Sequence, residues 1–266
     1  MLRPLILALL LALAWPVGAL AQAHDPEELE RTWQAAWVFL PTADEEGYRR
    51  ITAAELPDAL AGLEAPLPAL VYGHGCAGHY RASDVTGAFL ARAGYLVVMP
   101  DSFAREEKPT SCIPEKKLGG LHRAVLSWRH AELGYAIDRL RAFEQVRADA
   151  IFLMGFSEGG IATATFSATP VAGRIVEGWT CHAGWPEYRG LMSPADEPLL
   201  TLVAAQDPWF QLPILQGDCG AFMQDRPQSR SLVVEEPPQL AVSHWLTKDE
   251  ALQQEVLRFL ESNRPN

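Results

Sequence analysis

The chain has 266 residues, of which 48% are hydrophobic and 21% are charged, a composition that is ordinary for a globular protein. Its 33 acidic residues outnumber the 22 basic ones, which gives a formal net charge of −11 at pH 7. Such a surface would repel nucleic acid and anionic lipid, so neither is an expected partner.

The first 23 residues have the layout of a secretory signal peptide. Arg3 supplies one early positive charge, an apolar stretch runs from Leu5 to Trp15, and alanines stand at positions 19, 21 and 23. The apolar stretch is short for a membrane span, and an uncleaved membrane anchor is the alternative. We therefore expect a periplasmic or secreted protein without stable membrane association, with residues 1–23 removed and residues 24–266 forming one domain.

Short apolar runs alternate with segments of helical period along the rest of the chain. Continuous apolar runs are typical of strands that are covered on both faces. The expected strands are 68–73, 95–100, 150–155, 199–205 and 231–236, with weaker candidates at 35–40 and 174–179. The expected helices are one between Ser83 and Gly94, one over 130–143, and one over 247–260 that opens on a capping box of Thr247 and Glu250. This order predicts an α/β fold, a mostly parallel sheet with helices on both faces.

One segment does not fit a simple connection between elements. Residues 101–122 follow an expected strand and are long and polar. We interpret them as a functional loop over the C-terminal edge of the sheet. No break in composition marks a second domain.

Ser157 lies in the pattern G-x-S-x-G, written GFSEG over residues 155–159, between an expected strand and an expected helix. A nucleophile elbow has this arrangement, because the turn is strained and the flanking glycines let neighbouring chains approach while the serine hydroxyl is exposed. The alternative is a structural serine in a tight strand-to-helix turn.

The order serine, acid, histidine directs the search for the other members of a catalytic triad. His244 lies in a loop before the last helix, where its ring can reach the serine, whereas His182 lacks a well-placed carboxylate. Asp207 directly follows the strand at 199–205, and Asp218 is the reserve. We expect His244 to accept the Ser157 proton and Asp207 to orient the ring.

An oxyanion hole is the second requirement of such a site. One donor is expected from the backbone N–H of Glu158, the residue after the nucleophile. Another is expected from the loop YGHGCAGHY at 72–80, from the N–H of Cys76 or that of Gly75. For His74 a role in bracing this loop is favoured over direct chemistry.

The segments VYGHGCAG, GYLVVMPDSF, MGFSEGG, AAQDPW and SHW together resemble the dienelactone hydrolase family of the α/β-hydrolase superfamily, over about residues 65 to 260. The resemblance implies an eight-stranded sheet, a small substrate pocket and no metal or organic cofactor. It also suggests that Arg105 binds a substrate carboxylate. Two features differ: founding members of the family have a cysteine nucleophile where this chain has Ser157, and a glutamate in the first oxyanion loop.

The four cysteines would form two disulfides in an oxidising compartment, and their number alone leaves three connectivities open. The strand order of the superfamily implies the pairs Cys76 with Cys112 and Cys181 with Cys219. A zinc site built from Cys76, His79 and Cys112 is the competing interpretation.

These residues favour an exported serine hydrolase that cleaves a small ester or lactone through an acyl-enzyme. Acyl transfer or peptide cleavage by the same triad is a close variant. A non-catalytic binding or scaffold protein is the alternative from another class. Aromatic residues in 207–213, together with Trp185 and Trp245, either line an apolar pocket near the site or serve ordinary packing.

Overall fold

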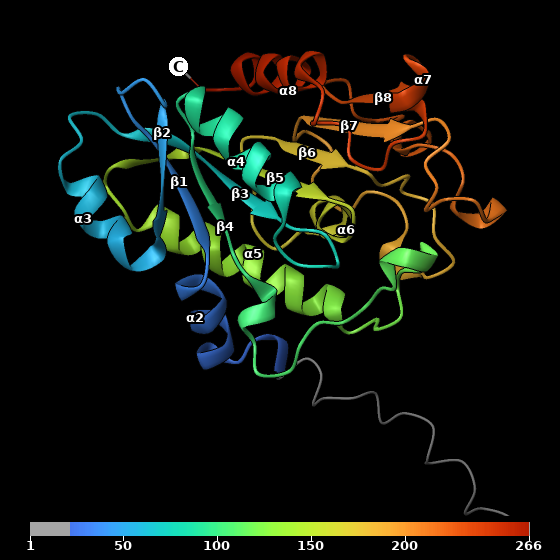
Figure 1. The fold of residues 1–266 in the computed structure, drawn as a ribbon, viewed down its shortest axis with the longest axis horizontal. Helices are drawn as coiled ribbons and strands as arrows, with labels where there is room; N and C mark the ends of the chain where they lie inside the picture. Colours follow the sequence, from blue (N-terminus) through green and yellow to red (C-terminus); the bar gives the residue numbers. More distant parts are fainter. Residues whose placement is uncertain (1–21, 266) are drawn as a thin grey trace, which may run out of the picture.

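A computed structural model describes residues 22–265, and its centre is one sheet of eight strands (Figure 1). The strand order is β2-β1-β4-β3-β5-β6-β7-β8. The first strand pairs antiparallel with both of its neighbours, and all other neighbours are parallel. The strands are β1 Trp37–Pro41, β2 Tyr48–Thr52, β3 Leu67–Gly73, β4 Leu96–Met99, β5 Val146–Phe156, β6 Arg174–Glu177, β7 Leu199–Ala204 and β8 Arg230–Val234. The predicted α/β class and the mostly parallel sheet are confirmed.

Helices cover both faces of this sheet. They are α2 Pro26–Gln34, α3 Leu56–Ala61, α4 Arg81–Arg92, α5 Val125–Arg141, α6 Glu158–Thr165, α7 Pro238–Ala241 and α8 Glu250–Ser262. Side chains alternate between two cores, because successive residues of a strand point to opposite faces. Val38 and Val71 pack in the core beneath α2, α3, α5 and α6, whereas Phe39 and Tyr72 pack in the core beneath α4 and α8. In Figure 1, α5 and α8 lie on opposite sides of the sheet.

The structure changes several predicted boundaries. Strand β2 was not expected, because its sequence YRRIT is polar and it lies at the edge of the sheet with one buried residue. Helix α4 begins two residues before Ser83, and α5 begins five residues before the predicted start. Asp249 caps α8 by accepting from the N–H groups of Ala251 and Leu252, so the predicted capping box at Thr247 is wrong.

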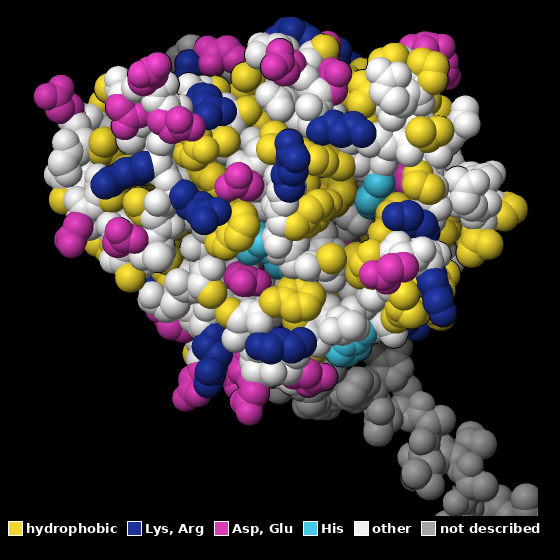
Figure 2. Space-filling view, in the orientation of Figure 1, with side chains coloured by type: hydrophobic (Ala, Val, Ile, Leu, Met, Phe, Trp, Pro, Cys, Tyr) yellow, Lys and Arg dark blue, Asp and Glu magenta, His cyan; other side chains and the backbone are white. Residues whose placement is uncertain are grey.

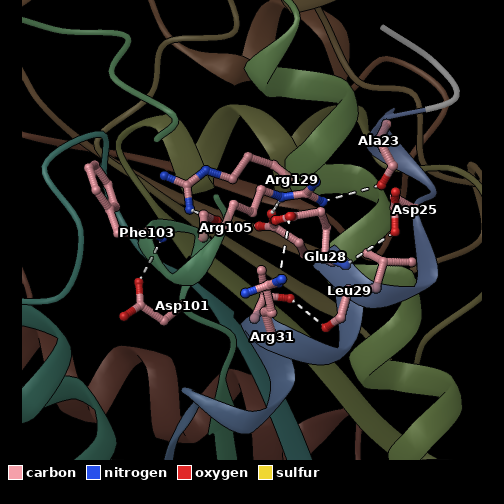
Figure 3. Close-up of polar contacts among 12 residues, drawn as sticks. Ala23, Asp25, Glu28, Leu29, Arg31, Asp101, Phe103, Arg105 and Arg129 are labelled. Carbon is pink, nitrogen blue, oxygen red and sulfur yellow. Dashed lines mark hydrogen bonds and ion pairs between the residues drawn. The ribbon is translucent and has the colours of Figure 1, made fainter. Parts of the chain in front are cut away.

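The folded chain includes residues that the sequence analysis assigned to the signal peptide. Ala23 is fully buried and packs with Trp128 in a small apolar cluster. The carbonyl groups of Gln22 and Ala23 each accept a hydrogen bond from Arg105, at 3.2 Å. Figure 3 shows this contact at Ala23. The predicted boundary at residue 23 stays a prediction, and residues 1–21, which hold most of the predicted signal peptide, lie outside the described part of the chain.

Within residues 22–265, none of the helices has both the length and the apolar composition that crossing a membrane requires.

Candidate active site

The turn between β5 and α6 holds Ser157 in an unusual backbone conformation. Its φ is +57° and its ψ is −118°, a strained region for a residue with a side chain. The glycines on either side are required by close contacts, because a Cβ on Gly155 would lie 2.0 Å from the carbonyl oxygen of Gly159, and a Cβ on Gly159 would lie 2.0 Å from that of Gly73. The strand-turn-helix context expected of a nucleophile elbow is therefore present.

Three of the predicted site residues are joined by hydrogen bonds. The Nε2 atom of His244 lies 2.9 Å from the hydroxyl oxygen of Ser157, and its Nδ1 atom lies 2.6 Å from Oδ2 of Asp207. The other carboxylate oxygen of Asp207 accepts from the N–H of Trp209 at 2.9 Å. A ring that donates from Nδ1 to Asp207 keeps Nε2 free to accept the serine proton.

The reserve acid Asp218 and the histidine that was not chosen, His182, lie elsewhere. Asp218 accepts from the N–H of Gly220 and caps a short 3₁₀ helix. His182 packs its ring edge-on against Phe222, at a centroid distance of 5.1 Å. Neither of them contacts Ser157, so the structure brings together the first choices of the sequence analysis.

Glu177 supports the loop that carries His244. It stands at the end of β6, where its carboxylate accepts from the N–H groups of Leu246 and Thr247 at 2.6 and 2.7 Å, and from the hydroxyl of Thr247 at 2.9 Å. Burial raises the pKa of Glu177 to about 7, although the three hydrogen bonds act in the opposite direction and lower it. The sequence analysis did not give this residue a role, although an acid in an apolar strand is a signal that could have found it.

The two expected oxyanion donors lie at the same cavity as Ser157. Cys76 and Glu158 both line it, together with His244. Within the described part of the chain, neither backbone N–H donates to another protein group. His74 is fully buried and its Nδ1 atom lies 2.7 Å from the carbonyl oxygen of Gly75, so it braces this loop as expected.

The cavity measures about 580 Å³ and is lined mainly by apolar and aromatic side chains. The predicted loop over the sheet edge contributes Lys116 to Gly120 to its wall. Large aromatic and aliphatic residues form much of the remainder: Ile161, Trp179, Trp185, Tyr188, Trp209, Phe210, Leu212, Ile214 and Leu215. Trp209 also stacks on the ring of His244, at a centroid distance of 5.1 Å. Trp245, in contrast, donates from its indole N–H to Thr247 and does not line the cavity.

Arg105 does not lie at this cavity, which corrects the role suggested by the resemblance. Its side chain is buried, and its Nε atom donates to Glu132 at 2.5 Å. Its two terminal nitrogens donate to the carbonyls of Gln22 and Ala23, of which Ala23 is labelled in Figure 3. Its guanidinium lies over the ring of Trp128. Because this guanidinium is buried and lies outside the cavity lining, it is not placed to bind a substrate carboxylate there.

Both cysteine pairs are disulfides, Cys76 with Cys112 and Cys181 with Cys219, as the resemblance implied. The first leaves no thiol for the zinc site considered as an alternative. Within residues 22–265, one group of potential metal ligands does lie close together, namely His74, His79 and Asp101. Its central member cannot bind a cation, because Nε2 of His74 accepts from Arg129 at 2.7 Å and the other ring nitrogen faces the Gly75 carbonyl.

Comparisons with known proteins agree with this architecture. A sequence model of the dienelactone hydrolase family matches residues 58–216. No significant match was found among curated protein sequences.

Solved structures with a similar fold include several hydrolases. Est1E from Butyrivibrio proteoclasticus with bound ferulic acid is 12% identical with a TM-score of 0.56, and the match covers 86% of this chain and 94% of that one. A serine hydrolase without a lid from Xanthomonas campestris is 14% identical with a TM-score of 0.52, over 87% and 89% of the two chains. A dienelactone hydrolase-like promiscuous phosphotriesterase from metagenomic libraries is 16% identical with a TM-score of 0.55, over 77% and 90%. At these identities the likeness establishes the α/β-hydrolase fold.

Proposed function

The chain belongs to the dienelactone hydrolase family, and from this membership and the arrangement of Ser157, His244 and Asp207 we propose that it is an exported serine hydrolase that cleaves small esters or lactones. The observation that carries the proposal is the continuous hydrogen-bonded series from Asp207 through His244 to Ser157. This series ends at a cavity that a small substrate can enter.

The reaction proposed for this site proceeds through an acyl-enzyme. His244 accepts the proton of Ser157 at Nε2 as the serine oxygen attacks the carbonyl carbon, and Asp207 stabilises the positive charge that develops on the ring. The N–H groups of Cys76 and Glu158 donate to the oxygen that becomes negative. His244 then protonates the departing alcohol, and a water molecule hydrolyses the acyl group from Ser157 by the same steps.

The cavity supports a substrate of modest size with an apolar or aromatic group. Its wall carries Trp179, Trp185 and Trp209, which offer large flat surfaces for such a group. Export is supported by the signal-peptide pattern of residues 1–23 and by the two disulfides, which persist in oxidising compartments.

Kinetics of hydrolysis of p-nitrophenyl acetate and butyrate test this function. Ser157→Ala and His244→Ala should each lower kcat by about 10⁴-fold or more, and Asp207→Asn by about 10⁴-fold. Two matched controls, His182→Ala and Asp218→Asn, replace the other histidine after Ser157 and the reserve acid. They should remain within about threefold of the wild-type kcat, because neither side chain contacts the triad.

Activity that survives Ser157→Ala would contradict the proposal. A wild-type protein that hydrolyses neither ester and does not react with serine-directed phosphonates would instead favour the non-catalytic binding protein.

A further inference from the structure

Arg129, a buried residue of α5, contacts both segments that supply the oxyanion donors. We propose that Arg129 is a positioning residue for the oxyanion hole, since its single guanidinium fixes the Gly75–Cys76 peptide on one side and Glu158 on the other. The inference rests on the proposed function and adds a residue that contacts neither the nucleophile nor its base.

The first contact fixes the peptide that carries the Cys76 N–H. The Gly75 carbonyl of this peptide accepts from Nη2 of Arg129 at 3.3 Å, from the ring of His74 at 2.7 Å and from the N–H of Gly78 at 3.1 Å. In a trans peptide the N–H points opposite to the C=O. The three donors that bind the Gly75 oxygen therefore fix the orientation of the peptide, and the Cys76 N–H points away from them.

The second contact fixes the residue that follows the nucleophile. The carboxylate of Glu158 accepts from Nη2 and Nε of Arg129 at 2.9 and 3.2 Å, and its other oxygen accepts from the hydroxyl of Ser111. Glu158 and Arg129 are both buried. Since an unpaired carboxylate here would repel a developing oxyanion, the guanidinium also neutralises an unfavourable charge beside the reaction.

Arg129, together with the backbone N–H of Ser102, determines which ring nitrogen of His74 carries the proton. Its Nη1 atom lies 2.7 Å from Nε2 of His74, and because a guanidinium can only donate, this nitrogen must accept. The proton therefore sits on Nδ1 and is donated to the Gly75 carbonyl. Burial and then the charge of Arg129 hold the pKa of His74 well below its usual value, which keeps the ring neutral.

A second buried arginine, Arg105, is linked to Arg129 indirectly, through Ser102 and Glu132. The Ser102 hydroxyl accepts from Arg129 and donates to Glu132, which in turn accepts from Arg105. Both arginines are drawn in Figure 3. Arg105 is as buried as Arg129 and is likewise paired with a buried glutamate, but it has no contact with Gly75 or Glu158. It is therefore a matched control for the purely structural effect of losing a buried ion pair.

The test compares Arg129→Lys and Arg129→Met with Arg105→Met in the full-length mature protein. Rates are expressed per active site, counted by titration with a fluorophosphonate, so that misfolded protein does not contribute. We expect kcat to fall by about 10- to 100-fold in both Arg129 variants with KM within about threefold. Lysine should not rescue, since one ammonium cannot donate to His74, Gly75 and Glu158 in the same fixed geometry. Arg105→Met should lower Tm by a similar amount and leave kcat within about threefold.

A second readout reports on the oxyanion directly. A trifluoromethyl ketone adds to the serine hydroxyl, so that its carbonyl oxygen becomes the oxyanion while the proton moves to the histidine. In the Arg129 variants the inhibition constant of this ketone should rise by the same factor by which kcat/KM falls.

Arg129 variants with wild-type kcat and ketone affinity would overturn the inference, and so would an equal loss in Arg105→Met. If Arg129→Met does not fold, Arg129→Lys decides by the same two readouts, since it keeps the charge beside Glu158. A wild-type protein without Ser157-dependent turnover would refute the proposed function, and the inference with it, so the two failures are distinguishable.

Discussion

At the scale of single residues, Glu177 links pH to stability. It is fully buried and its three hydrogen-bond donors are uncharged groups of residues 246 and 247. Its pKa rises from an ordinary value of 4.5 to about 7 in the folded protein. Between these values the unfolded chain has released this proton and the folded one has kept it, so the free energy of unfolding should fall as the pH rises through this window.

Glu177→Gln isolates this effect, because the amide oxygen can accept from the same two N–H groups without ever ionising. Relative to this variant, the wild-type free energy of unfolding should fall by up to about 3 kcal/mol from pH 4.5 to 7 and change no further above that. Urea denaturation at several pH values measures the difference. Parallel pH profiles for the two proteins would show that Glu177 ionises normally.

The residues of the proposed triad could be predicted from the sequence, and those proposed to act through another residue could not. Ser157 follows from a motif in its strand-turn-helix context, and His244 and Asp207 follow from chain order and from positions after strands. Arg129 has no local signal that separates it from other charges in helices. Glu177 has one, as an acid in an apolar strand, but that signal does not show that it binds residues 246 and 247. The substrate-binding role suggested for Arg105 was wrong because its position after a strand does not reveal its partners. Its guanidinium donates to Glu132 and to the carbonyls of Gln22 and Ala23.

At the scale of elements, the two disulfides offer a matched pair. They join residues 36 and 38 apart in sequence, so the chain-entropy estimate for each is about 4 kcal/mol. Cys76→Ala/Cys112→Ala releases both the segment of the proposed oxyanion donor Cys76 and the loop whose residues 116–120 line the cavity. We expect this double variant to lose about tenfold in kcat as well as stability, and Cys181→Ala/Cys219→Ala to lose stability with kcat within about threefold.

Thermal unfolding and ester kinetics on both double variants measure these effects. If the two double variants lost kcat to the same extent, the Cys76–Cys112 disulfide would contribute only to stability and would have no particular role at the site.

The first described residues predict where an exported protein is cleaved. Ala23 is buried and Gln22 holds Arg105 through its carbonyl, so cleavage after Ala23 would remove two partners of a buried guanidinium. Ala19 and Ala21 supply the small residues that a cleavage site needs if the cut follows Ala21. We expect the intact mass of the exported protein to correspond to a chain that begins at Gln22. A chain that begins at His24 would contradict this assignment.

Elements with a strong apolar pattern were predicted, and those held by contacts outside their own sequence were not. The central strands are continuous apolar runs because helices cover both of their faces. Strand β2 lacks such a run because it lies at the sheet edge. The capping residue of α8 was missed because Glu177, distant in sequence, binds Thr247 and leaves Asp249 to cap the helix.

At the scale of the whole molecule, the fold brings the residues of the site together at one edge of the sheet. Ser157, Asp207 and His244 follow β5, β7 and β8 in the chain, and they meet at the C-terminal edge of the sheet, where ligands of parallel α/β sheets bind. Acidic and basic side chains are interspersed over the face seen in Figure 2, without a large patch of one sign. This arrangement agrees with a small-molecule substrate rather than a nucleic acid.

Mass spectrometry after reaction with a fluorophosphonate tests whether Ser157 is the nucleophile of a hydrolase. We expect one phosphonyl group for each folded molecule, carried by the peptide that contains Ser157, and none after denaturation before labelling. A folded protein that hydrolyses esters while Ser157 stays unmodified, or one that carries the group on another residue, would contradict it.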